Sequence, residues 1–204
     1  MMLRDVCEKG VVMRKKLKTL LLVAPIFIIG CAGSSKYMVK ATPVQELSAS
    51  KALVYFMRPS GFGFAINFQI WEGYKLIGLS QAKSYFAYQC EPGKHLFIGR
   101  AENKRALEAD LEAGKSYYII TQVKMGGWKA RMAFIPVTRD SEYWDKVELY
   151  KKKLNFIVPN EEEIGKWTAK REAEIREEID EITDYIKTPE GQKYIVYIGK
   201  EDGR

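Results

Sequence analysis

Residues 105–123 read RALEADLEAGKSYYIITQV, and this stretch decides the fold class. Leu107, Ala109 and Leu111 alternate with residues of the opposite face, at the two-residue period of a half-buried β-strand. Ala113-Gly114 is a turn signal, and the run that follows it is aromatic and β-branched. The stretch therefore predicts two consecutive strands joined by a turn.

The same signals extend in both directions along the chain, from Lys51 to Thr138. The segments with strand character are 52–57, 65–71, 74–79, 84–90, 94–101, 105–111, 116–123 and 128–135, and turn residues separate them. Many short aromatic and β-branched strands at even spacing are typical of a sandwich or a barrel. The prediction is a mainly β protein, with an antiparallel β-sandwich of about seven or eight strands over residues 51–138.

Residues 139–204 have a different pattern, which predicts a helical C-terminal extension. Asn160, with Glu163 three residues later, resembles a capping box. Apolar residues then recur at steps of three and four up to Thr188-Pro189, which predicts one amphipathic helix of about 27 residues. These residues include Ile164, Trp167, Ile175, Ile179, Ile182 and Ile186. The last four are a candidate interaction stripe, which either packs on the chain's own sandwich or docks another protein. The final apolar run, 194–198, is an edge strand or an adhesive tail.

The N-terminal region predicts a lipoprotein signal peptide over residues 1–30. Residues 13–31, MRKKLKTLLLVAPIFIIGC, place a basic segment before an apolar one, and Met13 is the expected start. Ile28, Ile29 and Gly30 before Cys31 form a lipobox. We therefore expect cleavage before Cys31 and a covalent lipid, such as palmitate, on that residue. A secretory signal without lipidation is the alternative, whereas the apolar run is too short to span a bilayer, which takes about 20 residues.

The predicted lipid also sets the expected location. Residues 31–50 are small and polar, which predicts a lipidated cysteine followed by a flexible tether that reaches about 60 Å when extended. Ala32, rather than Asp, follows Cys31. This favours the outer membrane of a bacterial envelope, with the protein facing the periplasm.

Charge and cysteine content limit the other classes of function. The 30-residue leader holds six Lys/Arg and two Asp/Glu, so removing it lowers the net charge from +7 to +3. A nucleic-acid partner is therefore not expected. Of three cysteines, Cys7 precedes the expected start and Cys31 takes the lipid, so Cys90 has no partner for a disulfide. We interpret Cys90 as a small buried residue.

The sequence predicts neither an enzyme nor a metal or other cofactor beyond the covalent lipid. His95 is the only histidine, which leaves no ordinary zinc cluster. We interpret it as a strand-edge histidine that bonds the preceding Pro-Gly turn, because the chain has no Gly-x-Ser-x-Gly elbow. A hydrolase is a distant third hypothesis. Glu108 and Asp110 share one exposed strand face, which a solvated surface explains better than paired-carboxylate chemistry.

Two aromatic features are candidate interaction sites. Phe62 and Phe64 lie between flexible glycines in residues 61–65, and either insert into a membrane or a partner or fold back to plug the open end of the sandwich. The second feature is an aromatic face that stacks on a glycan. Its candidate residues are Trp71, Tyr85, Tyr88, Tyr117, Tyr118 and Trp128.

Several short motifs also resemble a known family. They are KALVYFMRP at 51–59, GYKLIG at 73–78, SYF at 84–86, PGKH at 92–95 and LEAGKSYY at 111–118. Their order resembles the family of small bacterial lipoproteins that carries the domain of unknown function numbered 2846. The 92–95 turn is also similar to that of surface-layer PEGA domains. The resemblance implies a β-sandwich attached to a bacterial envelope, without established catalysis and without functional residues to transfer.

These observations lead to two hypotheses about function. The first is a non-catalytic envelope lipoprotein that serves as an accessory or scaffold domain in a membrane-associated assembly, with an envelope protein as its partner. The alternative is a ligand-binding module that recognises cell-wall glycan or another envelope molecule through its aromatic face.

Overall fold

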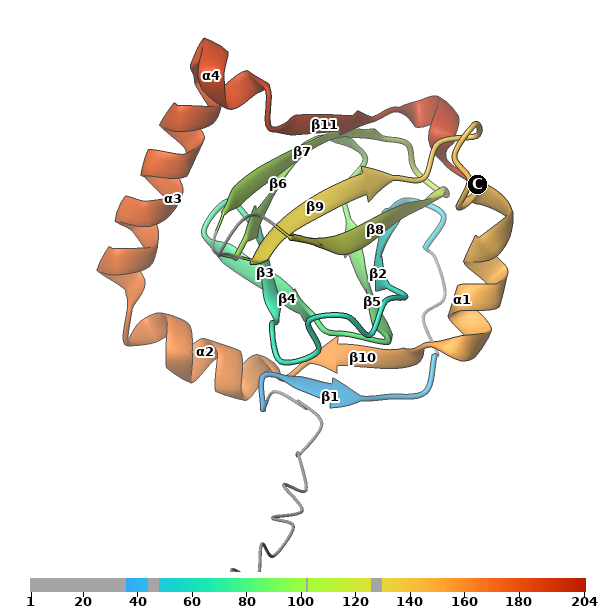
Figure 1. Cartoon of the computed structure of the whole chain (residues 1–204), viewed down its shortest axis with the longest axis horizontal. Coiled ribbons are helices and arrows are strands. Elements are labelled where there is room, and N and C mark those ends of the chain that lie inside the picture. Colours follow the sequence, from blue (N-terminus) through green and yellow to red (C-terminus); the bar gives the residue numbers. More distant parts are fainter. Residues whose placement is uncertain (1–35, 44–47, 102, 126–129) are drawn as a thin grey trace, which may run out of the picture. The chain divides into compact units, whose positions relative to one another are not determined.

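Two β-sheets form the body of the protein in a computed structural model that describes residues 36–43, 48–101, 103–125 and 130–204 (Figure 1). The first sheet contains, in spatial order, β1 (Met38–Lys40), β10 (Asn155–Pro159), β5 (Ser84–Cys90), β2 (Ala52–Arg58), β8 (Ser116–Met125) and β9 (Ala130–Pro136). The second contains β11 (Ile195–Ile198), β7 (Lys104–Leu111), β6 (Gly93–Arg100), β3 (Phe68–Glu72) and β4 (Lys75–Ser80). The fold is mainly β, as predicted.

Four α-helices complete the fold of the described residues. They are α1 (Val147–Lys153), α2 (Glu161–Ala169), α3 (Glu172–Lys187) and α4 (Pro189–Gln192), with short 3-10 turns at Trp144–Lys146 and Lys200–Asp202. In Figure 1, α2 and α3 lie on one side of the sheets and α1 lies on the other. No helix among the described residues is long and apolar enough to cross a membrane.

The core has three layers, and β2 contributes to two of them. All seven residues of β2 are buried. Val54 and Phe56 belong to the largest cluster, which both sheets supply, whereas Leu53 and Tyr55 belong to a second cluster that includes Val147 of α1. Burial on both faces explains why β2 reads as a continuous apolar run without alternation. At about 1.5–3 kcal/mol for each large apolar side chain, these layers are the main stabilising contribution.

The third layer lies between α3 and the outer face of the second sheet. The four isoleucines of the α3 stripe pack there with Trp71, Leu76, Ile98 and Ala106. The predicted helix of about 27 residues is in fact two helices, because the chain turns at Lys170–Arg171 between α2 and α3. The capping box prediction for Asn160 is half confirmed, since its side chain accepts a hydrogen bond from the Glu163 amide.

The structure corrects the predicted sheet topology. The described residues form eleven strands, of which eight, β2 to β9, lie within residues 51–138 and three lie outside that range; both sheets are mixed rather than antiparallel. β2 pairs in parallel with β8, β10 with β5, and β11 with β7. Parallel pairing joins segments far apart in the sequence. The alternation within a segment reports which face is buried but not which strand lies beside it.

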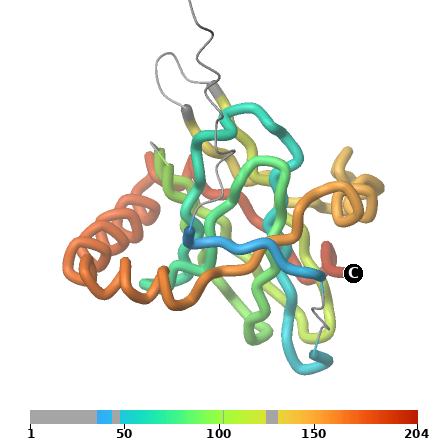
Figure 2. The backbone as a smooth tube through the Cα atoms, turned by 90° about the horizontal axis from the view of Figure 1, so that it is seen from below, coloured from blue at the N-terminus to red at the C-terminus, as the bar shows by residue number. Residues whose placement is uncertain are grey.

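The predicted domain boundaries are also corrected. Residues 38–40, expected in a flexible tether, form β1, which pairs antiparallel with β10 at the edge of the first sheet (Figure 2). The region from residue 139 onward is not an appendage, because β10 and β11 are members of the two sheets. The segment 194–198, an edge strand or a tail by sequence, contains β11 at the edge of the second sheet.

Candidate functional site

The loop of residues 61–65, here called the aromatic loop, presents two phenylalanines to solvent. Phe62 is 55% exposed and Phe64 is 63% exposed. The hypothesis that these side chains fold back to plug the sandwich is therefore wrong. Two large aromatic side chains exposed side by side on one loop make that loop the leading candidate for an interaction site.

The aromatic loop is held by Arg58, the last residue of β2, whose side chain is fully buried. Its Nη2 donates to the carbonyls of Phe62 and Gly63 at 3.0 and 2.7 Å, and its Nη1 donates to that of Ile66 at 2.5 Å. The guanidinium also lies over the Phe68 ring, 4.5 Å from its centroid. Burial lowers the pKa of Arg58 to about 10, so the group stays charged at neutral pH.

Gly63 is the residue that lets the loop approach this arginine. Its φ is +64°, in the left-handed region that side chains with a Cβ avoid. A Cβ there would also lie 3.1 Å from Cγ2 of Val123. The exposure of the two phenylalanines is therefore a consequence of a fixed backbone rather than of a loose loop.

A groove with a volume of about 320 Å³ opens beside Phe64. It is formed by β1, the aromatic loop, the turn between β4 and β5, and β10. Buried Met38 and Ile157 supply apolar wall, and Lys40 and Lys83 supply charge. We call this feature the loop groove. Because residues 38–40 were expected to belong to a tether, no sequence pattern placed Met38 or Lys40 beside Phe64.

A second polar cluster lies at the other end of the β2–β5 ladder. Arg58 pairs with Ser84 at one end of that ladder, and Ala52 pairs with Cys90 at the other. Near Cys90, Glu72 accepts hydrogen bonds from Tyr88 at 2.5 Å and from Nδ1 of His95. Nε2 of His95 contacts the Glu91 carbonyl at 2.8 Å. The interpretation of His95 as a residue that bonds the Pro-Gly turn is thus confirmed.

The electrostatics of this cluster follow from those contacts. Hydrogen bonding to Cys90 and to Glu72 raises the pKa of His95 to about 10. Burial alone would raise the pKa of Glu72, but the hydrogen bonds from His95 and Tyr88 outweigh it and lower that pKa. His95 is therefore an imidazolium at neutral pH, with its ring nitrogens engaged by Glu72 and Glu91. This geometry makes an ion pair rather than a general base.

The predicted glycan-stacking face does not form. Trp71, Tyr85, Tyr117 and Tyr118 are all buried in the core. Tyr88 is half-buried and bonded to Glu72, and Trp128 lies outside the described residues. Only Tyr117 lies between the two sheets. Tyr85 and Tyr118 lie on the outer face that packs with Val147 of α1, and Trp71 lies on the outer face that α3 covers, so these rings contribute to packing.

The isoleucine stripe of α3 is part of the protein's own core. Ile175, Ile179, Ile182 and Ile186 are each at most 5% exposed. The structure therefore follows the alternative in which the helix packs on its own chain, and it corrects the proposal that these residues form a docking stripe. Ile164 and Trp167 of α2 pack in the same cluster.

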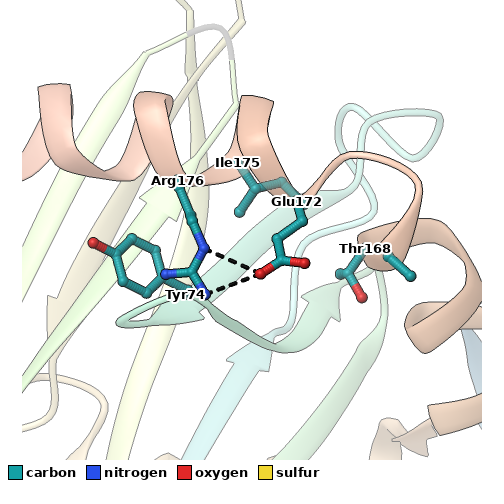
Figure 3. A pocket seen from close by; sticks show the side chains of 6 residues that line it. Tyr74, Thr168, Glu172, Ile175 and Arg176 are labelled. Atoms are coloured by element: carbon teal, nitrogen blue, oxygen red, sulfur yellow. Dashed lines mark hydrogen bonds and ion pairs between the residues drawn. The ribbon is translucent and has the colours of Figure 1, made fainter.

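A smaller pocket, with a volume of about 230 Å³, lies where α3 meets the β3–β4 turn (Figure 3). The Arg176 guanidinium lies 4.6 Å from the centroid of the Tyr74 ring and is paired with Glu172. Tyr74 donates a hydrogen bond to Asp180 at 2.6 Å. These polar groups already bond to one another, and the contacts of Tyr74 with Asp180 and Arg176 hold the β3–β4 hairpin against α3.

The remaining predicted site residues, Ile28, Ile29, Gly30 and Cys31, lie outside the described residues. Within the described ranges, no group of three or more His, Cys, Asp or Glu side chains is placed to hold a metal ion. No protein-family model matches the chain, and a search of curated proteins finds no significant match. The resemblance to the lipoprotein family therefore stays a prediction.

Sequence reasoning identified the aromatic loop but not the residues that support it. The predicted strand ended at residue 57, with Arg58 among the turn residues, although Arg58 follows Ala52, Val54 and Phe56 at steps of two and so shares their inward face. That alternation is the signal that would have placed its side chain inside. Nothing in the local pattern brings Lys40 close to Lys83, because their proximity depends on the pairing of β1 with β10 and of β10 with β5.

Proposed function

We propose that the protein is a lipid-anchored, non-catalytic accessory module of a bacterial envelope, and that its aromatic loop rests on the membrane to which Cys31 attaches it. In this proposal the two sheets act as a sandwich, a rigid support for the loop. The membrane is the outer membrane, the domain faces the periplasm, and it serves an assembly with another envelope protein. No catalysis and no cofactor other than the lipid is required.

The observation that carries the proposal is the short distance between Cys31 and the first strand. Only six residues, 32–37, separate Cys31 from Met38 of β1. A chain of that length spans at most about 25 Å, against the 60 Å expected for a free tether. Met38 and Phe64 line the same groove. A lipid on Cys31 therefore keeps the aromatic loop near the bilayer surface.

The chemistry of the loop supports the same orientation. Phe62 and Phe64 are large, apolar and exposed, and aromatic side chains partition favourably to the interface of a bilayer. The loop would add a contact made by the protein itself to the lipid anchor, and such a contact strengthens membrane binding in proportion to the apolar area that it buries. An enzyme role gains no support from the one histidine, which is held as an ion pair with Glu72.

The first test concerns the anchor. Metabolic labelling with a palmitate analogue should mark the wild-type protein and leave Cys31→Ala unlabelled. The variant should also move from the membrane fraction to the soluble fraction. Labelling of Cys31→Ala to the wild-type level would overturn the lipoprotein assignment.

The second test concerns the orientation. An environment-sensitive fluorophore at Ala65→Cys reports on the loop without altering either phenylalanine, and one at Glu190→Cys in α4 is the matched control. In vesicles of phosphatidylethanolamine and phosphatidylglycerol, a headgroup-labelled quencher lipid should quench the first probe roughly twofold more than the second. Phe62→Ser with Phe64→Ser should remove this difference. Equal quenching of the two probes in the otherwise unaltered protein would contradict the proposed orientation.

A further inference from the structure

We propose that the loop groove binds the headgroup phosphate of an anionic phospholipid, with an acyl chain lying along Phe64. The inference rests on the proposed orientation, in which this face meets the membrane. It goes further because it assigns a lipid class and a site within the domain. Three features of the groove support the inference: its apolar wall, its unopposed positive charge and the turn between β4 and β5 that forms part of its lining.

The apolar wall matches a hydrocarbon chain. Met38 and Ile157 are each about 3% exposed and form part of the groove, and Phe64 stands at its edge, mostly exposed. The Met38 side chain is fixed, because its Sδ accepts a hydrogen bond from the Leu79 amide at 3.3 Å. A chain of methylenes laid on this surface would cover area that Phe64 otherwise leaves in water.

The charge of the groove is positive and unopposed. Lys40 and Lys83 both line it, and neither forms an ion pair with any residue that the structure describes. By contrast, Lys36 pairs with Glu163 and Lys51 with Glu91. Among the described residues that line the groove, none is Asp or Glu. Two cations beside an apolar wall are complementary to a phosphate beside an acyl chain.

The turn between β4 and β5 holds an unused donor and a strained backbone. The Gln81 side chain is 8% exposed and lines the groove, and no described residue accepts a hydrogen bond from its Nε2. Lys83 has a φ of +56°, the one positive φ outside glycine in the described chain. Unsatisfied buried donors and left-handed residues that bear a side chain are costly, and strained positions of this kind cluster at functional sites and ligand clamps.

The shared chemistry, a phosphate diester or monoester, has two sources, a lipid headgroup or a free phosphate compound. The apolar wall beside Lys40 and Lys83 favours the lipid, because a small soluble phosphate would leave that wall in water. We therefore assign the lipid, and the free compound becomes an outcome of the test.

The test uses the full lipidated protein purified in a non-ionic detergent. It is titrated with short-chain phosphatidylglycerol, short-chain phosphatidylcholine or glycerol 3-phosphate, and native mass spectrometry measures the bound fraction. Lys40→Gln with Lys83→Gln removes the charge, and Gln81→Leu removes the donor. Lys152→Gln with Lys153→Gln, two exposed residues of α1, is the matched control. Urea unfolding of every variant checks that the fold is retained.

We expect phosphatidylglycerol to bind at least about tenfold more tightly than phosphatidylcholine, since each lysine near an anionic headgroup contributes roughly fivefold. The double groove variant should lose this preference and the α1 variant should keep it. If Lys83→Gln in the turn prevents folding, Lys40→Gln alone, on an edge strand, takes its place in the test. It should lose about half of the preference on a logarithmic scale. Gln81→Leu should weaken the binding of both phosphatidylglycerol and phosphatidylcholine.

Three results would overturn the inference. They are equal binding of the two lipids, an unchanged preference in the groove variant, or binding of glycerol 3-phosphate as tight as that of phosphatidylglycerol. The fluorophore at residue 65 separates this failure from that of the proposed function. If that probe is still quenched while the lipid preference is absent, the loop contacts the membrane but the groove is not a headgroup site.

Discussion

Arg58 joins two segments that would otherwise separate at one end of the sheets. Its guanidinium donates to the carbonyls of Phe62, Gly63 and Ile66 in and after the aromatic loop, and weakly to that of Ser80 in β4. No apolar side chain can replace these donors, so Arg58→Met leaves the partly buried carbonyls of Phe62 and Ile66 without this partner. We expect the free energy of unfolding to fall by about 2–4 kcal/mol, measured by urea denaturation.

The control for this prediction is Arg131→Met, at an exposed position in β9. It should change the free energy of unfolding by no more than about 0.5 kcal/mol. If Arg58→Met were as stable as this control, with no faster proteolysis of the aromatic loop, Arg58 would not be the anchor that we infer.

His95 gives the protein a pH-dependent contribution to stability. Its pKa in the folded protein is about 10, above the ordinary value of 6.5, so folding favours the protonated ring. The contribution is therefore complete below about pH 6.5 and is lost as the pH rises toward 10. Each unit of pKa difference corresponds to about 1.4 kcal/mol, which places the loss at a few kcal/mol.

The measurement is urea unfolding of wild type and His95→Gln at pH 6, 7.5 and 9, and the difference between the two proteins is the quantity of interest. Gln keeps a hydrogen-bonding side chain but does not titrate. Because Glu72 is ionised over this whole range, its own titration does not enter. A stability difference that stays constant with pH would show that Cys90 and Glu72, the neighbours of His95, do not hold the extra proton.

At the level of elements, α3 is bound to the second sheet by its isoleucine stripe. Ile182 is completely buried between Trp71, Ile98 and the neighbouring isoleucines. Ile182→Ala should lower the free energy of unfolding by about 2–5 kcal/mol, because a cavity replaces the side chain. Glu177→Ala, on the exposed face of the same helix, should have little effect. Equal, small effects of the two substitutions would mean that the helix is not docked on its own sheet.

The helix and the strands differ in how much of them the sequence predicts. The stripe at three- and four-residue steps identified the buried face of α3, and alternation identified the segments that became β2 to β9. The pattern failed where pairing partners are distant. β1 has three residues and pairs with β10, and β10 has five residues and pairs with β1 and β5. Such short segments carry too little periodicity to be recognised before the sheet that contains them is known.

The same limit applies to the candidate site. Phe62 and Phe64 were identified because two bulky aromatics between glycines are locally unusual. Their exposure depends on Arg58, whose side chain binds the backbone carbonyls of the loop. The loop groove depends on the pairing of β1 with β10 and of β10 with β5. Local composition predicted the candidate interaction loop. The contacts that support this loop join residues far apart in the sequence and became visible only in the structure.

At the level of the whole molecule, the segments before residue 51 and after residue 138 contribute strands to both sheets. β1 and β10 extend the first sheet, β11 extends the second, and Arg204 exchanges two backbone hydrogen bonds with Ser116 of β8. Residues after 138 also supply Val147 and Phe156 to the second core layer and the five buried isoleucines of α2 and α3 to the third. The sequence boundary at residue 138 therefore does not delimit an independent domain.

A chain that ends at Thr138 should consequently fail to fold cooperatively. Truncation would expose Trp71, Leu76 and Ile98 on one outer face and Tyr55 and Tyr118 on the other. A two-sheet protein with both outer faces uncovered loses more apolar burial than a net stability of about 5–15 kcal/mol allows. For the truncated chain we expect no cooperative urea transition and poor dispersion in an amide NMR spectrum. The chain that extends to residue 204 should show a cooperative transition and well-dispersed signals. A truncated chain with sharp, dispersed signals would mean that residues 51–138 form a domain by themselves, with the helices merely attached.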